Sequence, residues 1–131
     1  MFRSPSTVYE RKFETVADGD YYSPKISGDF RYHDIYIEFY SSTNFSPASI
    51  ITKDQLTGTV TFTGTPVDAP NEGVGEEYIS ASENGTLTLG TADYTPGLIT
   101  GLLKRVKVNL ATVAGAGSPV AFKLIVKSSA G

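Results

Sequence analysis

The 131-residue sequence contains no cysteine and no tryptophan, and it has a single histidine. Without cysteine the chain can form neither a disulfide framework nor a thiolate metal site, so its stability has to come from packing, strand pairing or partner chains. One histidine and the absence of a G-x-S-x-G sequence leave almost no material for a nucleophilic triad. We therefore expect no catalytic residues of the usual covalent kind, and no enzyme.

Long apolar runs are also missing. The longest stretch without a charged or strongly polar residue is far shorter than the ~20 residues that a membrane-spanning helix needs. The start, MFRSPSTVYERK, lacks the apolar stretch of a signal peptide. We expect a soluble chain that makes no membrane contact and is not exported by the usual route.

Alternation of apolar and polar side chains is the dominant pattern that the sequence does contain. Residues 34–40 place Ile35, Ile37 and Phe39 on one face of a strand and polar or aromatic residues on the other. Similar alternation recurs in residues 58–64, 77–83, 86–89, 105–110 and 122–127. Helical spacing occurs only in residues 96–104, where two glycines favour a turn or bulge. The pattern predicts an all-β fold, an antiparallel β-sandwich or jelly roll with an extended N-terminal segment.

Turn residues predict how these strands connect. Asn84-Gly85 suits a two-residue hairpin turn between residues 77–83 and 86–89. A glycine-rich loop, residues 113–119, is expected to join the last two strands as a long hairpin. Charged residues interrupt the apolar pattern near the start, so residues 1–20 are predicted to be an N-terminal arm or edge strand. Residues 21–131 would then form a single β-sandwich domain.

Charge is distributed unevenly along the chain. Residues 54–103 carry seven acidic and no basic side chains, whereas residues 104–131 carry five basic and no acidic ones. In the expected final hairpin, the cations of one strand would lie beside those of the other, and like charges across a sheet are unfavourable. We expect this basic face to contact the acidic stretch of the same chain, that of a second copy, or an acidic partner. The candidate interface residues are Phe2, Arg3, Tyr9, Glu76, Glu77, Asp93, Arg105, Lys107, Lys123 and Lys127.

Other candidate sites have a simpler interpretation as ordinary structure. His33 and Asp34 are adjacent on an expected strand, so their side chains would point to opposite faces, and a surface or strand-end histidine is expected. Asp18-Gly19-Asp20 lacks the spacing of a calcium loop and reads as a turn, so no metal or cofactor is expected. A carboxylate pair, Glu76 or Glu77 with Asp93, is the least favoured alternative, because only a suitable separation would permit glycoside hydrolysis.

Aromatic and basic residues leave two binding hypotheses to weigh. Five tyrosines, at positions 21, 22, 32, 36 and 40, could stack on sugars or fill an interface. The absence of tryptophan counts against sugar binding, because tryptophan is the largest stacking platform. The five C-terminal cations have only Phe122 interleaved among them, which favours a protein contact or a solvated face over nucleic acid.

Three stretches resemble a known class of proteins. LTGTVTFTGTP, NGTLTLGTADYT and GLLKRVKVNLATVAGAGSPVAFKLIVKS resemble the cadence of small tailed-bacteriophage virion proteins, in which β-sandwich domains decorate capsids or build tails. The resemblance implies a homo-oligomeric structural protein of the virion, assembled in the host cytoplasm. It also implies a capsid decoration or cement role, with the major capsid protein or other virion proteins as partners. The alternative is a tail-associated or carbohydrate- or receptor-binding β-sandwich module.

Overall fold

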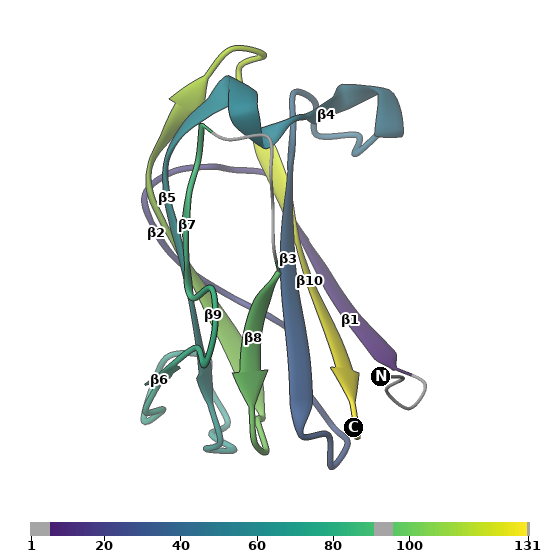
Figure 1. Ribbon diagram of the computed structural model, residues 1–131, viewed down its shortest axis with the longest axis vertical. Coiled ribbons are helices and arrows are strands. Elements are labelled where there is room, and N and C mark those ends of the chain that lie inside the picture. The colour runs from purple at the N-terminus through teal and green to yellow at the C-terminus, as the bar shows by residue number, and fades with distance from the viewer. Residues whose placement is uncertain (1–5, 91–95, 131) are drawn as a thin grey trace.

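Two antiparallel sheets packed face to face make up the protein (Figure 1), as a computed structural model shows for residues 6–90 and 96–130. Sheet A contains β1 (Thr7–Phe13), β10 (Ala121–Ser129), β3 (Tyr32–Tyr40), β4 (Ile50–Ile51) and β8 (Gly97–Thr100). Sheet B contains β2 (Gly19–Tyr22), β9 (Arg105–Gly115), β5 (Leu56–Thr65), β6 (Ile79–Ser80) and β7 (Thr86–Thr88). Two short 3₁₀ turns, η1 (Pro47–Ser49) and η2 (Lys53–Gln55), flank β4. The predicted all-β sandwich is confirmed.

The strand order is that of a jelly roll. Strands β1, β10, β3 and β8 lie side by side in sheet A, and β2, β9, β5 and β7 do so in sheet B. Consecutive long strands therefore change sheet at most connections, and loops gather at the two ends of the sandwich. The short strands β4 and β6 extend the outer edges of β3 and β5.

Alternation places the core between the sheets. The inner side chains of β9 and of β10 are each at most 1% exposed. They are Val106, Val108 and Leu110 on β9 and Phe122, Leu124 and Val126 on β10. The predicted inward residues of β3 and β5 join the same cluster, so the period-two pattern identified the core correctly on four strands.

The expected C-terminal hairpin is wrong. β9 pairs with β2 and β5 in sheet B, whereas β10 pairs with β1 and β3 in sheet A. The connection between β9 and β10 crosses from one sheet to the other at one end of the sandwich (Figure 1). Both strands are central in their sheets. If they were paired as a hairpin, their apolar faces would lie side by side in one sheet and could not pack against each other.

The expected hairpin at Asn84-Gly85 is also wrong. β6 and β7 each pair with β5, along successive parts of the same edge, and the register gives no pairing between them. Between β6 and β7 the chain leaves sheet B and contacts β8 of sheet A. The Ser82 N–H donates to the Leu98 carbonyl at 2.8 Å, and the Leu98 N–H donates to the Glu83 carbonyl at 2.9 Å. Asn84 does take a positive φ of 51°, as a turn asparagine can. The dipeptide therefore redirects the chain between the sheets and closes no hairpin.

Residues 96–104, expected to form a turn or bulge, contain a strand. β8 pairs with the first half of β3, and Ile99 is fully buried beside it. The two glycines have distinct uses. A Cβ at Gly97 would lie 2.8 Å from the Phe62 ring, so the close approach of the sheets requires glycine there, and Gly101 has a φ of 105° in the turn that follows β8.

β1 is the outer strand of sheet A, and its side chains help to close that side of the sandwich. Phe13 stacks on Phe122 with ring centroids 4.7 Å apart and meets Tyr21 of β2 edge to face at 5.1 Å. Arg11 donates to the Tyr22 carbonyl at 3.0 Å, from one sheet to the other. The segment therefore contributes to the core as well as to the sheet.

His33 lies near the start of β3 and is fully buried, which corrects the expectation of a surface position. Its Nε2–H donates to the Gly101 carbonyl at 2.9 Å, and Nδ1 then accepts from the Ser128 hydroxyl at 2.8 Å. Burial lowers the pKa of His33 below its ordinary 6.5, although the hydrogen bond to the Gly101 carbonyl opposes the shift in part. A neutral, doubly hydrogen-bonded imidazole is thus part of the structural core.

Gly58 provides a test of the sheet B register. It lies at the register shift between Thr57 and Thr59, with a φ of +117°, and a Cβ there would lie 2.8 Å from the carbonyl oxygens of Ala111 and Thr112. We predict that Gly58→Ala lowers the free energy of unfolding by about 2 to 4 kcal/mol, measured by urea denaturation. Gly75→Ala is the matched control, since Gly75 has a φ of +73° but nothing within 4 Å, and should cost only about 1 kcal/mol. Equal losses in the two variants would contradict the steric argument.

Candidate interaction site

The acidic segment between β5 and β6 folds back over sheet B. We call residues 66–78 the strap. Asp68 pairs with Lys25 at 2.5 Å, Glu72 with Arg11 at 2.5 Å and Glu76 with Arg105 at 2.5 Å. Cations from three separate parts of the chain thus hold a stretch that contains no cation of its own. Part of the acidic stretch is therefore paired with cations of the same chain.

The ion pair of Arg105 and Glu76 is the only buried one among the described residues. The side chain of Arg105 is 6% exposed and that of Glu76 is 1% exposed. The second carboxylate oxygen of Glu76 accepts from the Tyr78 hydroxyl at 2.7 Å and from the Gly73 N–H at 2.7 Å. The carboxylate is therefore satisfied on both oxygens, as a buried charge requires.

This environment shifts the protonation of the cluster. Burial alone would raise the pKa of Glu76, but the hydrogen bonds from Tyr78 and Gly73 and the charge of Arg105 prevail and lower it. Burial and the Glu76 carboxylate raise the pKa of Tyr78. The Lys107 ammonium lies 4.4 Å from the centroid of the Tyr78 ring. The cations of β9 therefore contact acidic and aromatic side chains of the strap.

The expected continuous basic face does not form, because β9 and β10 lie in different sheets. Arg105 and Lys107 project from the outer face of sheet B, whereas Lys123 and Lys127 project from that of sheet A. Lys123 pairs with Glu10 at 2.9 Å, and Lys127 lies 5.0 Å from the Tyr36 ring centroid. The four predicted residues are thus separated into two pairs. Arg105 and Lys107 contact the strap, whereas Lys123 and Lys127 contact side chains of sheet A.

The remaining candidate residues have different locations. Glu77 is exposed on the strap, and Tyr9 packs on the edge of the core, with its hydroxyl 3.5 Å from that of Ser27. Phe2, Arg3 and Asp93 lie outside the described residues. The carboxylate pair considered for hydrolysis therefore has one member, Asp93, without a described position, while Glu76 is engaged by Arg105.

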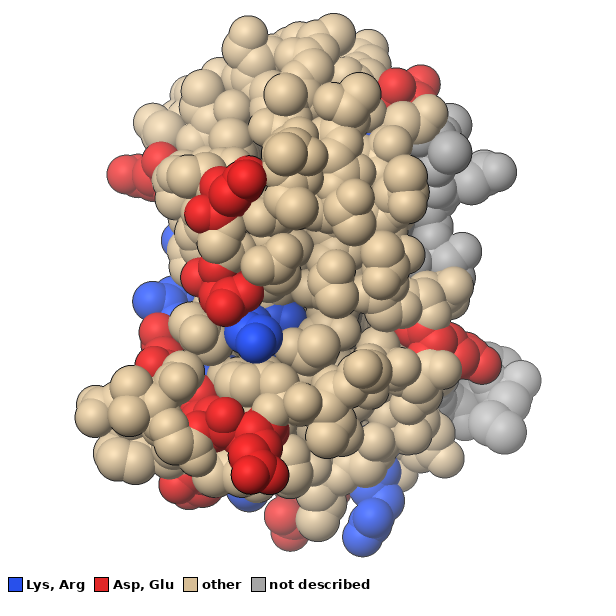
Figure 2. Space-filling model, turned by 90° about the vertical axis from the view of Figure 1, so that its left-hand side faces the viewer, with Lys and Arg blue, Asp and Glu red and all other residues tan. Residues whose placement is uncertain are grey.

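A face that the sequence reading missed covers the other half of sheet B. Thr59, Thr61, Thr86, Thr88 and Ala111 point away from the core there; we call this set the threonine face. They align in rows across β7, β5 and β9, since Thr88 is opposite Thr59, which is opposite Ala111. Figure 2 shows a continuous uncharged area over this part of the molecule, with most of the charged residues toward the other end. The T-x-T spacing in TVTFT and TLT was the available signal.

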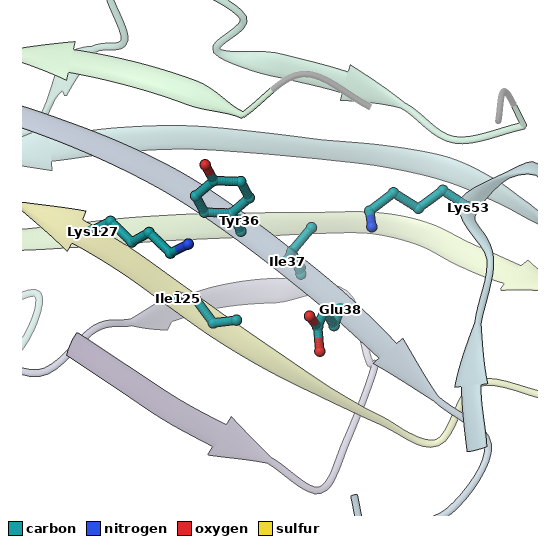
Figure 3. Close-up of a pocket in the computed structure, with 6 residues that line it drawn as sticks. All are labelled: Tyr36, Ile37, Glu38, Lys53, Ile125 and Lys127. Carbon is teal, nitrogen blue, oxygen red and sulfur yellow. The ribbon is translucent and has the colours of Figure 1, made fainter. Parts of the chain in front are cut away.

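Sheet A has a shallow hollow on its outer face. Its volume is about 220 Å³, and it is lined by Tyr36, Ile37, Glu38, Lys53, Ile125 and Lys127. Figure 3 shows Tyr36 and Glu38 projecting from β3, Ile125 and Lys127 from β10, and Lys53 from the segment beyond β4. Burial lowers the pKa of Lys53, an effect that Glu38 opposes. The lining combines one aromatic ring with charges of both signs.

The five tyrosines do not form one group. Tyr21 is directed between the sheets, where it meets Phe13 and Phe122, and Tyr22 lies on sheet B near Tyr78. Tyr32, Tyr36 and Tyr40 share the outer face of β3. Since neighbours in sequence separate across a strand, only the last three could have been assigned to a common face.

The Asp18-Gly19-Asp20 segment has a structural use. Asp18 accepts from the Thr112 N–H at 2.7 Å, and Asp20 accepts from the Asn109 amide at 2.9 Å. Among residues 6–90 and 96–130, no group of three or more histidine, cysteine, aspartate or glutamate side chains is placed to hold a metal ion. No helix in this part of the chain has the length and apolarity to span a membrane.

No protein-family model matches the chain, and no curated protein matches it in sequence.

The buried ion pair leads to a stability prediction. Glu76→Gln should lower the free energy of unfolding by about 3 to 5 kcal/mol at neutral pH, because Arg105 is left without its counter-charge. Glu72→Gln is the matched control, since Arg11 and Glu72 are 40% and 39% exposed, and it should cost less than about 1 kcal/mol.

Acidification should remove the difference between wild type and Glu76→Gln. A carboxyl group with a lowered folded-state pKa contributes stability above its unfolded pKa, and this is lost as pH falls through the folded pKa. Urea denaturation of both proteins between neutral and acidic pH measures the difference. A gap that stays constant down to the acid limit would show that Glu76 acts through packing alone.

Proposed function

We propose that this chain is a non-enzymatic structural protein of a tailed-phage virion, a capsid decoration protein that stabilises contacts between coat subunits. The observation that carries the proposal is the threonine face, an uncharged area across three strands of sheet B. The resemblance of residues 56–66, 84–95 and 101–128 to small virion proteins supplies the class of partner.

The composition of the threonine face suits a lasting contact. The centres of protein interfaces are depleted in charged residues, since burial of an unpaired charge is costly. Threonine presents a methyl group for packing and a hydroxyl that can donate and accept, so it loses little on desolvation against a polar partner. The ion pairs of the strap lie on the other half of the sheet, where they leave this area uncharged.

The fold supports the proposal by analogy. Jelly rolls are frequent among viral capsid domains, and also among lectins, so the architecture is compatible with a virion role without being specific to it. A decoration protein acts in many copies, and repetition lets a modest contact become effective on a shell through avidity.

Shell binding tests this role. The purified chain, mixed with capsid shells of the virus whose genome encodes it, should co-sediment with them, and mass spectrometry should find it in purified virions. Thr86→Lys and Thr88→Lys, at exposed positions of the threonine face, should each weaken shell binding about tenfold or more. Thr52→Lys is the matched control, since Thr52 is exposed, makes no side-chain cap hydrogen bond and lies outside that face. Absence from virions, or equal binding by all variants, would contradict the proposal.

The hollow on sheet A favours a second candidate, a tail-associated module that binds a carbohydrate or receptor. Tyr36 offers a ring for stacking, and Glu38 and Lys127 offer polar groups beside it. On a glycan array, this candidate predicts a specific signal that Tyr36→Ala abolishes and that Tyr32→Ala, on the same face outside the hollow, retains. No signal above background from the wild-type protein would remove this candidate.

A further inference from the structure

One long edge of sheet A has no strand beside it in the described part of the chain. β1 pairs with β10 on one side only, and Figure 1 shows its other side at the margin of the molecule. Val8 is 52% exposed, and Glu10 and Lys12 are exposed as well. The main-chain donors and acceptors on that side are thus available to an added strand.

The sequence of β1 is self-complementary in one register. In an antiparallel pair that continues a sheet, opposed residues lie on the same face, so a symmetric pair of β1 strands must be centred on one residue. Centring on Glu10 opposes two glutamates, and centring on Lys12 opposes two lysines. Centring on Tyr9 leaves Glu10 opposite Val8. Only centring on Arg11 brings Glu10 of each copy opposite Lys12 of the other.

We propose that two copies of this chain associate through β1, antiparallel and centred on Arg11, so that their A sheets join into one continuous sheet. The register contains two Glu10 to Lys12 pairs related by the two-fold axis, on the outer face of the sheet. On the inner face, Tyr9 of each copy lies opposite Phe13 of the other, which adds two aromatic cross-strand pairs.

The charge at the centre of this pair is already compensated. Arg11 of one copy lies opposite Arg11 of the other, and like charges there would be unfavourable. Each guanidinium is, however, paired with Glu72 at 2.5 Å, bonded to the Tyr22 carbonyl at 3.0 Å and placed 5.1 Å from the Phe13 ring centroid. These contacts direct it toward sheet B of its own chain.

Neighbouring residues also fit the added strand. Lys123 lies opposite Lys12 in the register of β1 and β10 and pairs with Glu10 at 2.9 Å. Glu10 would therefore lie between a lysine of its own chain and one of the second copy, and a carboxylate has acceptor sites for both. The inference deepens the proposed contact role and rests on it for its biological use, but the dimer is a property of the isolated protein.

Charge exchange provides the test. Sedimentation equilibrium of the wild-type chain at up to about 100 μM should show a dimer. Glu10→Lys and Lys12→Glu should each raise the dimer dissociation constant about tenfold or more, because each opposes like charges twice. The double exchange E10K/K12E restores two opposite-charge pairs and places a glutamate opposite Lys123, so it should recover dimerisation. A wild-type monomer, or a dimer that the single exchanges leave unchanged, would overturn the proposal.

Cysteine cross-linking provides an independent readout of the register, since the chain has no cysteine of its own. Glu10→Cys mixed with Lys12→Cys should form a disulfide-linked heterodimer under mild oxidation, because opposed residues lie within disulfide reach. A mixture of Thr7→Cys with Lys12→Cys is the control, since these positions are not opposed, and should cross-link much more slowly. Equal rates in both mixtures would exclude this register. Shell binding without a dimer would refute only the pairing, and a dimer without shell binding only the virion role.

Discussion

The contact of β9 with β10 across the space between the sheets is the interaction on which the remaining parts depend. Each has neighbouring strands on both sides in its own sheet, and each directs three apolar side chains into the same cluster. Once these faces are buried against each other, the alternate side chains of both strands must point outward. The positions of Lys107, Lys123 and Lys127 on two opposite surfaces follow from this single packing arrangement.

The charged residues show a second level of organisation. The acidic strap and the three cations that it binds are 29 to 61 residues apart in the sequence, and the fold brings them together. The three ion pairs contribute different amounts to the free energy of unfolding because they differ in exposure. The Glu76 pair is buried, with both carboxylate oxygens hydrogen-bonded, whereas the pairs of Asp68 and Glu72 remain in contact with water. Attachment of the strap to sheet B therefore depends chiefly on Arg105 of β9. The strap does not cover the threonine face.

Local pattern predicted the strands better than their partners. The alternation in β3, β5, β9 and β10 identified the inward residues, because burial of one face imposes a period of two on any strand. The same pattern does not indicate which of the two sheets a strand joins. Residues 113–119 could have closed a hairpin or crossed between layers, and only the need of two central strands to face each other decides between them. Asn84 took the turn conformation that its identity favours, but β5 already offered an edge to β6 and to β7 separately.

For the candidate sites too, the local pattern identified residues but not the contacts that they make. Arg105 and Glu76 were recognised as charges in need of partners, yet their meeting depends on how the strap folds, which no local signal specifies. The expected surface position of His33 was wrong, because a polar residue can be buried when partners from other parts of the chain satisfy it, here Ser128 and Gly101. The threonine face was visible as T-x-T spacing, but the common outward direction of β5 and β7 emerges only from their pairing.

The pairing of β1 with β10 places the first strand of the chain beside the last, with Thr7 opposite Ser128. During synthesis, the residues of β1 leave the ribosome long before those of β10 are translated. Sheet A therefore cannot be completed before β10 has left the ribosome, and until then the edge of β3 that β10 will occupy and the side of β1 that faces it stay open to solvent or to a chaperone.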